Sequence, residues 1–482
     1  MTTPYDVPAT AAPRPETARP LENVLFSAAL VARGLPWADL PARTLGLDAL
    51  TSAGLARRLM THLQGRRDGR SVRLRTPFGT FVVPLTRADA EGLLARAAGA
   101  GALGTASGLA TDGRRCGLSP HVVPAGAWDA LTQEELAGLT ARVGGHLDAV
   151  LGARREDGAL DEDGWRTGML RLSRHVVLGA GAAADTLLSE MVRAATGAVG
   201  SRAYEERAAA LRRRLAPYLA DPEPGSLAGR LAARSQGAPE TDLAVAHALS
   251  LVSTATSVSA LQALALLAAG AATGDVTSPE SAVDLALEHY PPLPATVYPV
   301  RAPLDADGAA IAPGDEILYD RALLGPLTSG ESADPAWALC GSPSGCATAR
   351  FAVLVGREVV RGATAEARPV LLAPRFAPDG LPGSLGPGSV AVALVGADGP
   401  TVTAEAYGDG LPAYGARGRV GADRLDRHAE RLSACAADTG WNGSETGERF
   451  RTALLAHADR CANAAADVRR AARWFSGWTS PG

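Results

Sequence analysis

The segment ALCGSPSGCATARFA, residues 338–352, joins a loop of glycine, serine and proline to an alanine-rich stretch that predicts a helix. Cys346 ends the loop, so its side chain lies at the N-terminus of that helix. The helix dipole and the backbone N–H groups at this end favour a thiolate over a thiol. A thiolate held in this way suits a soft metal centre, and it is one of the axial ligands of haem iron. The alternative is a buried loop cysteine with a structural role.

The run from Ala244 to Thr273 is long enough to cross a bilayer and carries no charge apart from a possible one on His247. Serine and threonine residues recur between positions 250 and 259, and many of the other residues are alanine, which is only weakly apolar. These features predict a long buried central helix of a soluble protein and argue against a membrane span.

Helical patterns outnumber strand patterns along the chain. Residues 72–85 alternate apolar and polar residues around Pro77 and Gly79, which predicts a β-hairpin, and a helix begins after Thr86. Helical patterns dominate residues 128–275, and short strands are expected around residues 296–319. The sequence therefore predicts a mainly α protein of the α+β class with small β-sheets.

Taken in order, these segments resemble the cytochromes P450. The Cys346 loop resembles the family's haem-binding pattern Phe-Gly-x-Gly-x-His/Arg-x-Cys-x-Gly, although little beyond the cysteine and the small residues after it is retained. Residues 72–95 resemble the first sheet and the B helix, and Ala244–Gly270 resembles the I helix. Ala282–Pro294 resembles the K helix with its proline-rich exit, and residues 311–317 resemble the Ile-Pro-x-Gly hairpin.

The resemblance implies a cytochrome P450-like fold over residues 21–395. Residues 1–20 are expected to be a disordered leader, and residues 396–482 a linker followed by a C-terminal helical hairpin. In the second helix of this hairpin, one stripe at helical spacing is predicted to contain Phe450, Leu454, His457, Cys461, Ala465, Val468, Ala472 and Phe475. The turn Trp441-Asn442-Gly443 resembles that of the small secreted WXG proteins, but a hairpin that packs on the main domain or on a partner is the favoured interpretation.

The resemblance also implies a haem cofactor and four site residues. Cys346 would be the axial ligand, Thr256 the alcohol on the oxygen side, Arg301 a propionate partner, and Ser344 would stand where the family's loop carries a cation. The implied activity is that of a monooxygenase or a peroxide-using oxidase acting on a small organic molecule. A monooxygenase would need a separate redox partner of the ferredoxin or flavodoxin type.

Several departures from the family pattern point to an alternative function. The Glu-x-x-Arg pair of the K helix is replaced by Leu285 and Glu288, and the arginine that usually contacts a propionate falls on Tyr298. Ala255 stands in place of the acid of the I helix. Buried propionates need partners, so either Arg114, Arg115 and Arg301 supply them or haem binding is weak or lost. In the second case the chain would be a degenerate scaffold that binds and activates a partner enzyme through its tail; a third hypothesis is a helical interaction protein.

Composition and the remaining motifs exclude several classes. The net charge is −4 and the 47 basic residues are all arginine, which gives no sign of nucleic-acid binding. The cysteines number five, an odd count at wide spacing, and together with the absence of a signal-like N-terminus this predicts a cytoplasmic protein without a disulfide framework. No Cys-x-x-Cys, His-Glu-x-x-His or other local Cys/His cluster is present, so a zinc site is not expected. The glycine motifs at residues 99–104 and 176–184 lack the βαβ context of a dinucleotide site.

Overall fold

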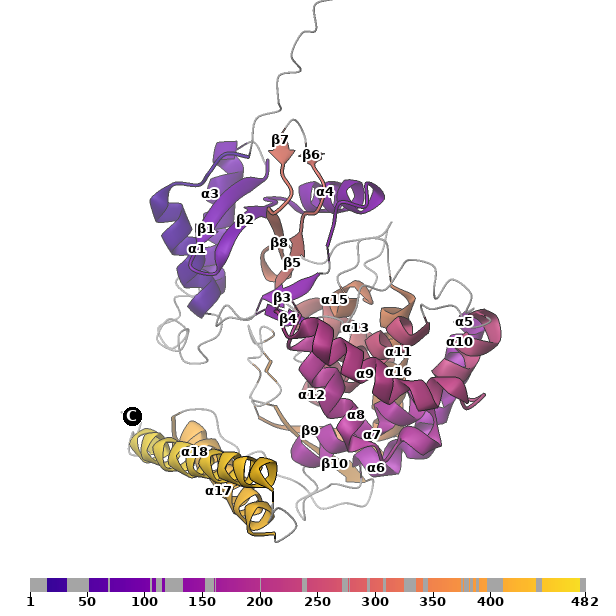
Figure 1. Ribbon diagram of the computed structural model, residues 1–482. Coiled ribbons are helices and arrows are strands. Elements are labelled where there is room, and N and C mark those ends of the chain that lie inside the picture. Colours follow the sequence, from indigo (N-terminus) through magenta and orange to yellow (C-terminus); the bar gives the residue numbers. More distant parts are fainter. Residues whose placement is uncertain are drawn as a thin grey trace, which may run out of the picture.

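The structure is a computed structural model of the 482-residue chain, and it describes most of that chain. The described residues, apart from a few isolated positions, are 15–32, 52–67, 70–104, 106–109, 115–117, 133–151, 162–199, 201–235, 241–270, 278–292, 295–306, 309–324, 335–340, 346–373, 385–386, 390–396, 411–438 and 444–476. A sheet region, a helical body and a C-terminal helical hairpin follow one another in Figure 1.

One mixed sheet gathers strands from distant parts of the sequence. Its order is β1-β2-β8-β5-β3-β4, and only β2 and β8 run parallel to each other. The predicted hairpin is confirmed, with Val72 opposite Val83. The strands of this sheet are β1 (Val72–Thr76), β2 (Gly79–Val83), β3 (Ser107–Leu109), β4 (Arg115–Gly117), β5 (Ala295–Pro299) and β8 (Glu316–Asp320).

Helices α1 (Pro20–Ala32) and α3 (Ser52–Arg67) lie beside this sheet (Figure 1). Their apolar side chains share a core with β1 and β2. The backbone of Thr17 forms a bridge with Arg73 of β1, so the end of the expected leader is part of the fold. Residues 1–14, for which disorder was predicted, lie outside the described residues.

The helical body follows the sheet and confirms the predicted dominance of helix. Thr86 caps α4 by accepting a hydrogen bond from the N–H of Asp89, as its position before two acidic residues predicts. Residues 176–178, at the start of the second glycine motif, belong to the helix α7. The helices are α4 (Arg87–Gly99), α5 (Gln133–Thr140), η2 (Ala141–His146), α6 (Leu147–Leu151), α7 (Glu162–Leu178), η3 (Ala180–Ala182), α8 (Thr186–Thr196), α9 (Tyr204–Ala220), α10 (Leu227–Ser235) and α13 (Pro279–His289).

A long helix runs through the middle of this body. It consists of α11 (Thr241–Ser250), a π-helical turn η4 (Leu251–Thr256) and α12 (Ser257–Ala269). Among the described residues it is the one helix long and apolar enough to cross a membrane, but 78% of its apolar window is buried inside the protein. The prediction of a buried central helix is confirmed. Short π-helical turns of this kind often occur at functional sites.

The central helix packs directly against α16 (Ala347–Ala365), the helix that follows Cys346. The hydroxyl of Thr256 donates a hydrogen bond of 3.2 Å to the carbonyl of Ala352. One turn further along α16, a Cβ atom placed on Gly356 would lie 3.2 Å from Cγ2 of Thr256. The absence of a side chain at Gly356 therefore allows the two helices to approach this closely.

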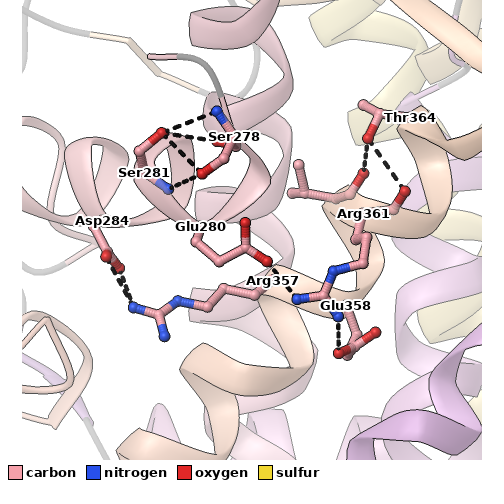
Figure 2. A network of polar contacts seen from close by, with 9 residues as sticks. Ser278, Glu280, Ser281, Asp284, Arg357, Glu358, Arg361 and Thr364 are labelled. Atoms are coloured by element: carbon pink, nitrogen blue, oxygen red, sulfur yellow. Dashed lines mark hydrogen bonds and ion pairs between the residues drawn. The ribbon is translucent and has the colours of Figure 1, made fainter. Parts of the chain in front are cut away.

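Two ion pairs join α16 to α13, as Figure 2 shows. Arg357 of α16 donates to both carboxylate oxygens of Asp284 at 2.7 and 2.8 Å, and Arg361 pairs with Glu280. Asp284 is the residue before Leu285, where the family's Glu-x-x-Arg motif would begin. The motif is thus absent as predicted, and α13 is joined to α16 by these ion pairs instead.

Two short strand pairs, two short helices and the C-terminal hairpin are the remaining elements of the described residues. The first helix of the expected C-terminal hairpin, α17, begins at Leu411. The elements are β6 (Leu304–Ala306), β7 (Ala309–Ile311), α14 (Arg321–Leu324), α15 (Trp337–Cys340), β9 (Ala367–Ala373), β10 (Ala391–Gly396), α17 (Leu411–Ala437) and α18 (Glu445–Ser476).

Helices α17 and α18 form the predicted hairpin, and alanines line the interface between them. The buried residues repeat at intervals of seven: Ala422, Ala429 and Ala436 on α17, and Ala458, Ala465 and Ala472 on α18. Small side chains at heptad spacing let the two helices pack closely. The predicted stripe is right for Ala465 and Ala472 and wrong for Phe450 and His457, which are exposed. The turn at residues 441–443 lies outside the described residues.

The contact at Gly356 yields a prediction about stability. Replacing Gly356 with leucine should lower the free energy of unfolding by about 1–3 kcal/mol, because the new side chain must force Thr256 and its helix away from α16. The matched control is Gly65→Ala in α3, where no atom lies within 4 Å of the added Cβ. That change should raise stability by about 0.5–1 kcal/mol. Urea denaturation of both variants measures the difference, and equal effects would contradict the packing described here.

Candidate functional site

Three side chains from separate parts of the chain meet at the N-terminus of α16. His247 comes from α11, Cys340 from the end of α15, and Cys346 is the N-cap residue of α16. Both sulfur atoms, Sγ of Cys340 and Sγ of Cys346, lie 3.4 Å from Nε2 of His247. The three atoms all lie within 4.8 Å of one another, which satisfies the geometry of a shared metal site.

The site is partly buried, with His247 enclosed and the two cysteines of intermediate exposure, and its environment favours a thiolate on Cys346. The backbone N–H of Ala349 donates a hydrogen bond of 3.4 Å to Sγ of Cys346, as expected at the start of a helix. The pKa of Cys346 lies well below its ordinary value. Hydrogen bonding with Cys340 is the largest cause; burial opposes the shift, while His247 and the Ala349 N–H add to it.

His247 is almost completely enclosed, with an exposure of 1%. Its second ring nitrogen, Nδ1, is buried and has no hydrogen-bond partner among the described residues. Among the described residues, this imidazole therefore makes its polar contacts through Nε2 alone, with the two sulfur atoms. A buried polar side chain normally needs partners that compensate for its lost hydration.

Tyr298 of β5 lies near enough to Cys340 to interact with it electrostatically. It stands where the family's propionate-binding arginine would be, and it is fully buried. Burial raises the pKa of Tyr298 well above its usual value, and the neighbouring Cys340 is the next cause. A neutral phenol buried near Cys340 thus replaces a cation at this position.

The structure does not bring the other predicted site residues into this cluster. Thr256 is buried, and its hydroxyl is directed to the carbonyl of Ala352. Arg301 is exposed on the loop after β5. Its backbone N–H donates a hydrogen bond to the backbone carbonyl of Ala102. Arg115 pairs with Glu316 at 2.7 Å. Ser344 and Arg114 lie outside the described residues, so their predicted roles, like those of Thr256 and Arg301, stay predictions.

The arrangement around Cys346 does not fit a haem group. The resemblance would place the porphyrin between the I-like helix and the Cys346 loop. In the structure an imidazole from that helix is in contact with the sulfur itself, at 3.4 Å, and no planar macrocycle can pass between them. Further along, Thr256 and Ala352 are in direct hydrogen-bond contact across the same two helices. This conformation therefore does not support a reaction at haem bound to Cys346.

Sequence patterns missed the cluster because its members are far apart in the chain. Cys340 and Cys346 are separated by five residues, and His247 lies more than ninety residues before them. The expectation that no zinc-type site exists rested on the absence of local motifs, whereas His247, Cys340 and Cys346 are possible ligands brought together from distant segments. The one signal available was an isolated histidine in the most apolar helix of the chain.

The lowered pKa of Cys346 predicts an unusual pH dependence of its reactivity. In reduced, metal-free protein the thiolate should persist as the pH falls below about 8.5, the value for an ordinary cysteine. A small haloacetamide should then label Cys346 at near-neutral pH, and its rate should fall only as the pH passes through the lowered pKa. Mass spectrometry of the labelled peptide between pH 5 and 9 (roughly the window of thiol titration) measures this, with exposed Cys435 as the control. A midpoint for Cys346 at or above that of Cys435 would contradict it.

Comparison with known proteins gives a fold but no sequence relative. No protein-family model matches the chain, and no curated protein matches it. Among solved structures, CYP108D1 from Novosphingobium aromaticivorans DSM12444 aligns with 80% of this chain and 100% of its own, at 14% identity and a TM-score of 0.53. Cytochrome P450 CYP109Q5 from Chondromyces apiculatus aligns with 71% of this chain and 95% of its own, at 16% identity and a TM-score of 0.48.

Cytochrome P450 Eryk from S. erythraea aligns with 75% of this chain and 98% of its own, at 15% identity and a TM-score of 0.47. At identities this low, such a likeness can support a shared fold and nothing finer. The order of the sheet and the long buried helix before α16 agree with the likeness to CYP108D1. The chain thus has a divergent cytochrome P450-like fold with small β-sheets, extended at its C-terminus by a helical hairpin.

Proposed function

We propose that this protein uses the P450-like fold without haem, as a scaffold that binds and activates a partner enzyme. The observation that carries the proposal is the contact of 3.4 Å between Nε2 of His247 and Sγ of Cys346. A haem-thiolate enzyme needs that face of the sulfur for iron. Here the face is covered by a side chain of the helix that would otherwise lie on the far side of the porphyrin.

The polar groups around the site support the same conclusion. Haem brings two carboxylates, and burying them without cationic partners is costly. Tyr298 occupies the position of the usual arginine, while Arg115 is already paired with Glu316. Arg301 is exposed and lies on a loop after β5. Of the arginines that the resemblance assigns to the propionates, the two described ones are thus paired or exposed. Nη1 of Arg115 and two nitrogens of the buried Arg321 have no hydrogen-bond partner among the described residues.

The C-terminal hairpin supports a binding role. The interface between α17 and α18 is filled by alanines, whereas two large apolar residues of α18, Phe450 and Leu455, are 46% and 44% exposed. Exposed aromatic and aliphatic side chains of this kind are common in protein–protein interfaces. The hairpin is therefore the element that we assign to docking of the partner.

A second candidate, a haem-thiolate oxidase acting on a small organic molecule, is favoured by one observation. Cys346 caps α16 and has a lowered pKa, which is the environment that an axial thiolate requires. This function requires α11 to withdraw His247 from the sulfur. Thr256, Arg301 and Ser344 would then take the roles that the resemblance implies, and a monooxygenase would in addition need a ferredoxin- or flavodoxin-type redox partner.

An absorption spectrum distinguishes the two candidates. Full-length protein is expressed with a haem precursor, offered free haem, and then reduced under carbon monoxide. It should not show the red-shifted Soret band of a thiolate–haem–CO complex. Nε2 of His247 contacts the sulfur that would bind iron, and Tyr298 stands in place of the propionate-binding arginine, which is the reason for this expectation. Cys346→Ser is the matched control, because it removes the thiolate at nearly constant side-chain size. A shifted band that is present in the original protein and lost in this variant would overturn the scaffold proposal in favour of the oxidase.

A further inference from the structure

We infer that His247, Cys340 and Cys346 form a binding site for a divalent metal ion of the zinc class. The inference rests on the proposed function, because Cys346 cannot bind haem iron and take part in this site at the same time. It assigns the site a ligand that the P450-like fold does not imply.

The ligand set suits a borderline-soft metal. Two thiolates and one imidazole are ligands that zinc prefers, whereas magnesium and calcium prefer oxygen ligands. No carboxylate belongs to the group, which consists of one histidine and two cysteines. Three protein ligands would leave the fourth position of a tetrahedral ion to a water molecule or to a group of a bound ligand.

The distances agree with the edges of a tetrahedron around zinc. With Zn–S of about 2.3 Å and Zn–N of about 2.0–2.1 Å, tetrahedral angles separate sulfur from nitrogen by about 3.5 Å. Nε2 of His247 lies 3.4 Å from Sγ of Cys340 and 3.4 Å from Sγ of Cys346. The two sulfur atoms lie within 4.8 Å of each other, so the three atoms can serve as ligands to one ion.

The position of His247 is explained by a metal and is otherwise costly. The imidazole is buried at 1% exposure, and Nδ1 has no hydrogen-bond partner among the described residues. Thiols are weak hydrogen-bond partners, so contacts of Nε2 with two sulfurs compensate poorly for lost hydration. A coordinated ion would give this ring a strong interaction in a place where the described residues supply none.

The three ligands are held by well-packed elements. His247 lies on α11, which contacts both α16 and the π-helical turn η4, and Cys346 is fixed by its capping hydrogen bond from Ala349. Ligands carried by helices and helix ends are pre-organised for binding. Binding would release the thiol protons that remain on the two cysteines, so metal affinity should rise with pH.

The hairpin contains a second group of possible ligands, His428, His457 and Cys461, which the experiment must separate from the first. Both of these histidines are exposed, and Nδ1 of His457 already contacts Nη2 of Arg460 at 2.9 Å. The test is therefore made in full-length protein that carries Cys461→Ser. In this background the site described above is the remaining complete group among the described residues.

The test titrates the reduced, metal-free Cys461→Ser protein with Zn²⁺ by calorimetry and with Co²⁺ by absorption. We expect one equivalent of metal, a thiolate-to-cobalt charge-transfer band in the near ultraviolet, and a Tm that rises with Zn²⁺ concentration. Adding Cys340→Ser, Cys346→Ser or His247→Gln should each weaken binding by about 100-fold or more, because changes of supporting residues alone cost 10- to 100-fold. Circular dichroism of each variant establishes that it is folded.

Cys435→Ser, which changes an exposed cysteine outside the group, should leave the stoichiometry and affinity unchanged. Failure to bind Zn²⁺, or binding that folded Cys340→Ser and Cys346→Ser variants retain in full, would overturn the inference. In that case a negative haem spectrum would leave the scaffold proposal standing. A thiolate–CO band that depends on Cys346 would overturn both.

Discussion

The direct contact between the central helix and α16 sets the geometry of the whole site. Gly356 allows Thr256 to approach α16, and the hydrogen bond from Thr256 to Ala352 fixes the distance between the two helices. Because the same central helix carries His247, this packing also brings the imidazole to the sulfur of Cys346. The two helices thus pack directly against each other where the resemblance would place a cofactor.

The helix pair α13 and α16 shows how the fold compensates for a missing motif. In the family, a Glu-x-x-Arg pair within the K helix braces the haem side. In this chain Arg357 and Arg361 of α16 reach across to Asp284 and Glu280 of α13 (Figure 2). These pairs are partly exposed, so each contributes modestly to stability. Their effect is to fix α16, and with it Cys346, relative to the neighbouring helix.

The hairpin has a different structural basis from the body of the protein. Its helices pack through alanines at heptad spacing and are joined by Arg469, which pairs with Asp423 and Asp426 of α17. This interface leaves Phe450 and Leu455 exposed. In the proposed function, the main body holds the cysteine–histidine site. The hairpin provides the surface that binds a partner.

Local patterns in the sequence determined most of the secondary structure. The β1–β2 hairpin, the cap at Thr86, the buried central helix and the C-terminal hairpin follow from apolar periodicity and from turn or capping residues. These signals act over a few residues, so they can be read without tertiary information. The ordered set of such segments was also enough to indicate a P450-like fold, which the likeness to CYP108D1 bears out.

The tertiary structure alone decided the composition of the site. Cys346 was identified from its loop, but its partners His247 and Cys340 are defined by the packing of α11 and α15 around the start of α16. Whether a gap for a cofactor remains between two helices depends on side-chain volumes at distant positions, such as Thr256 and Gly356. No local pattern encodes that distance, because it results from close packing between segments that are remote in the sequence.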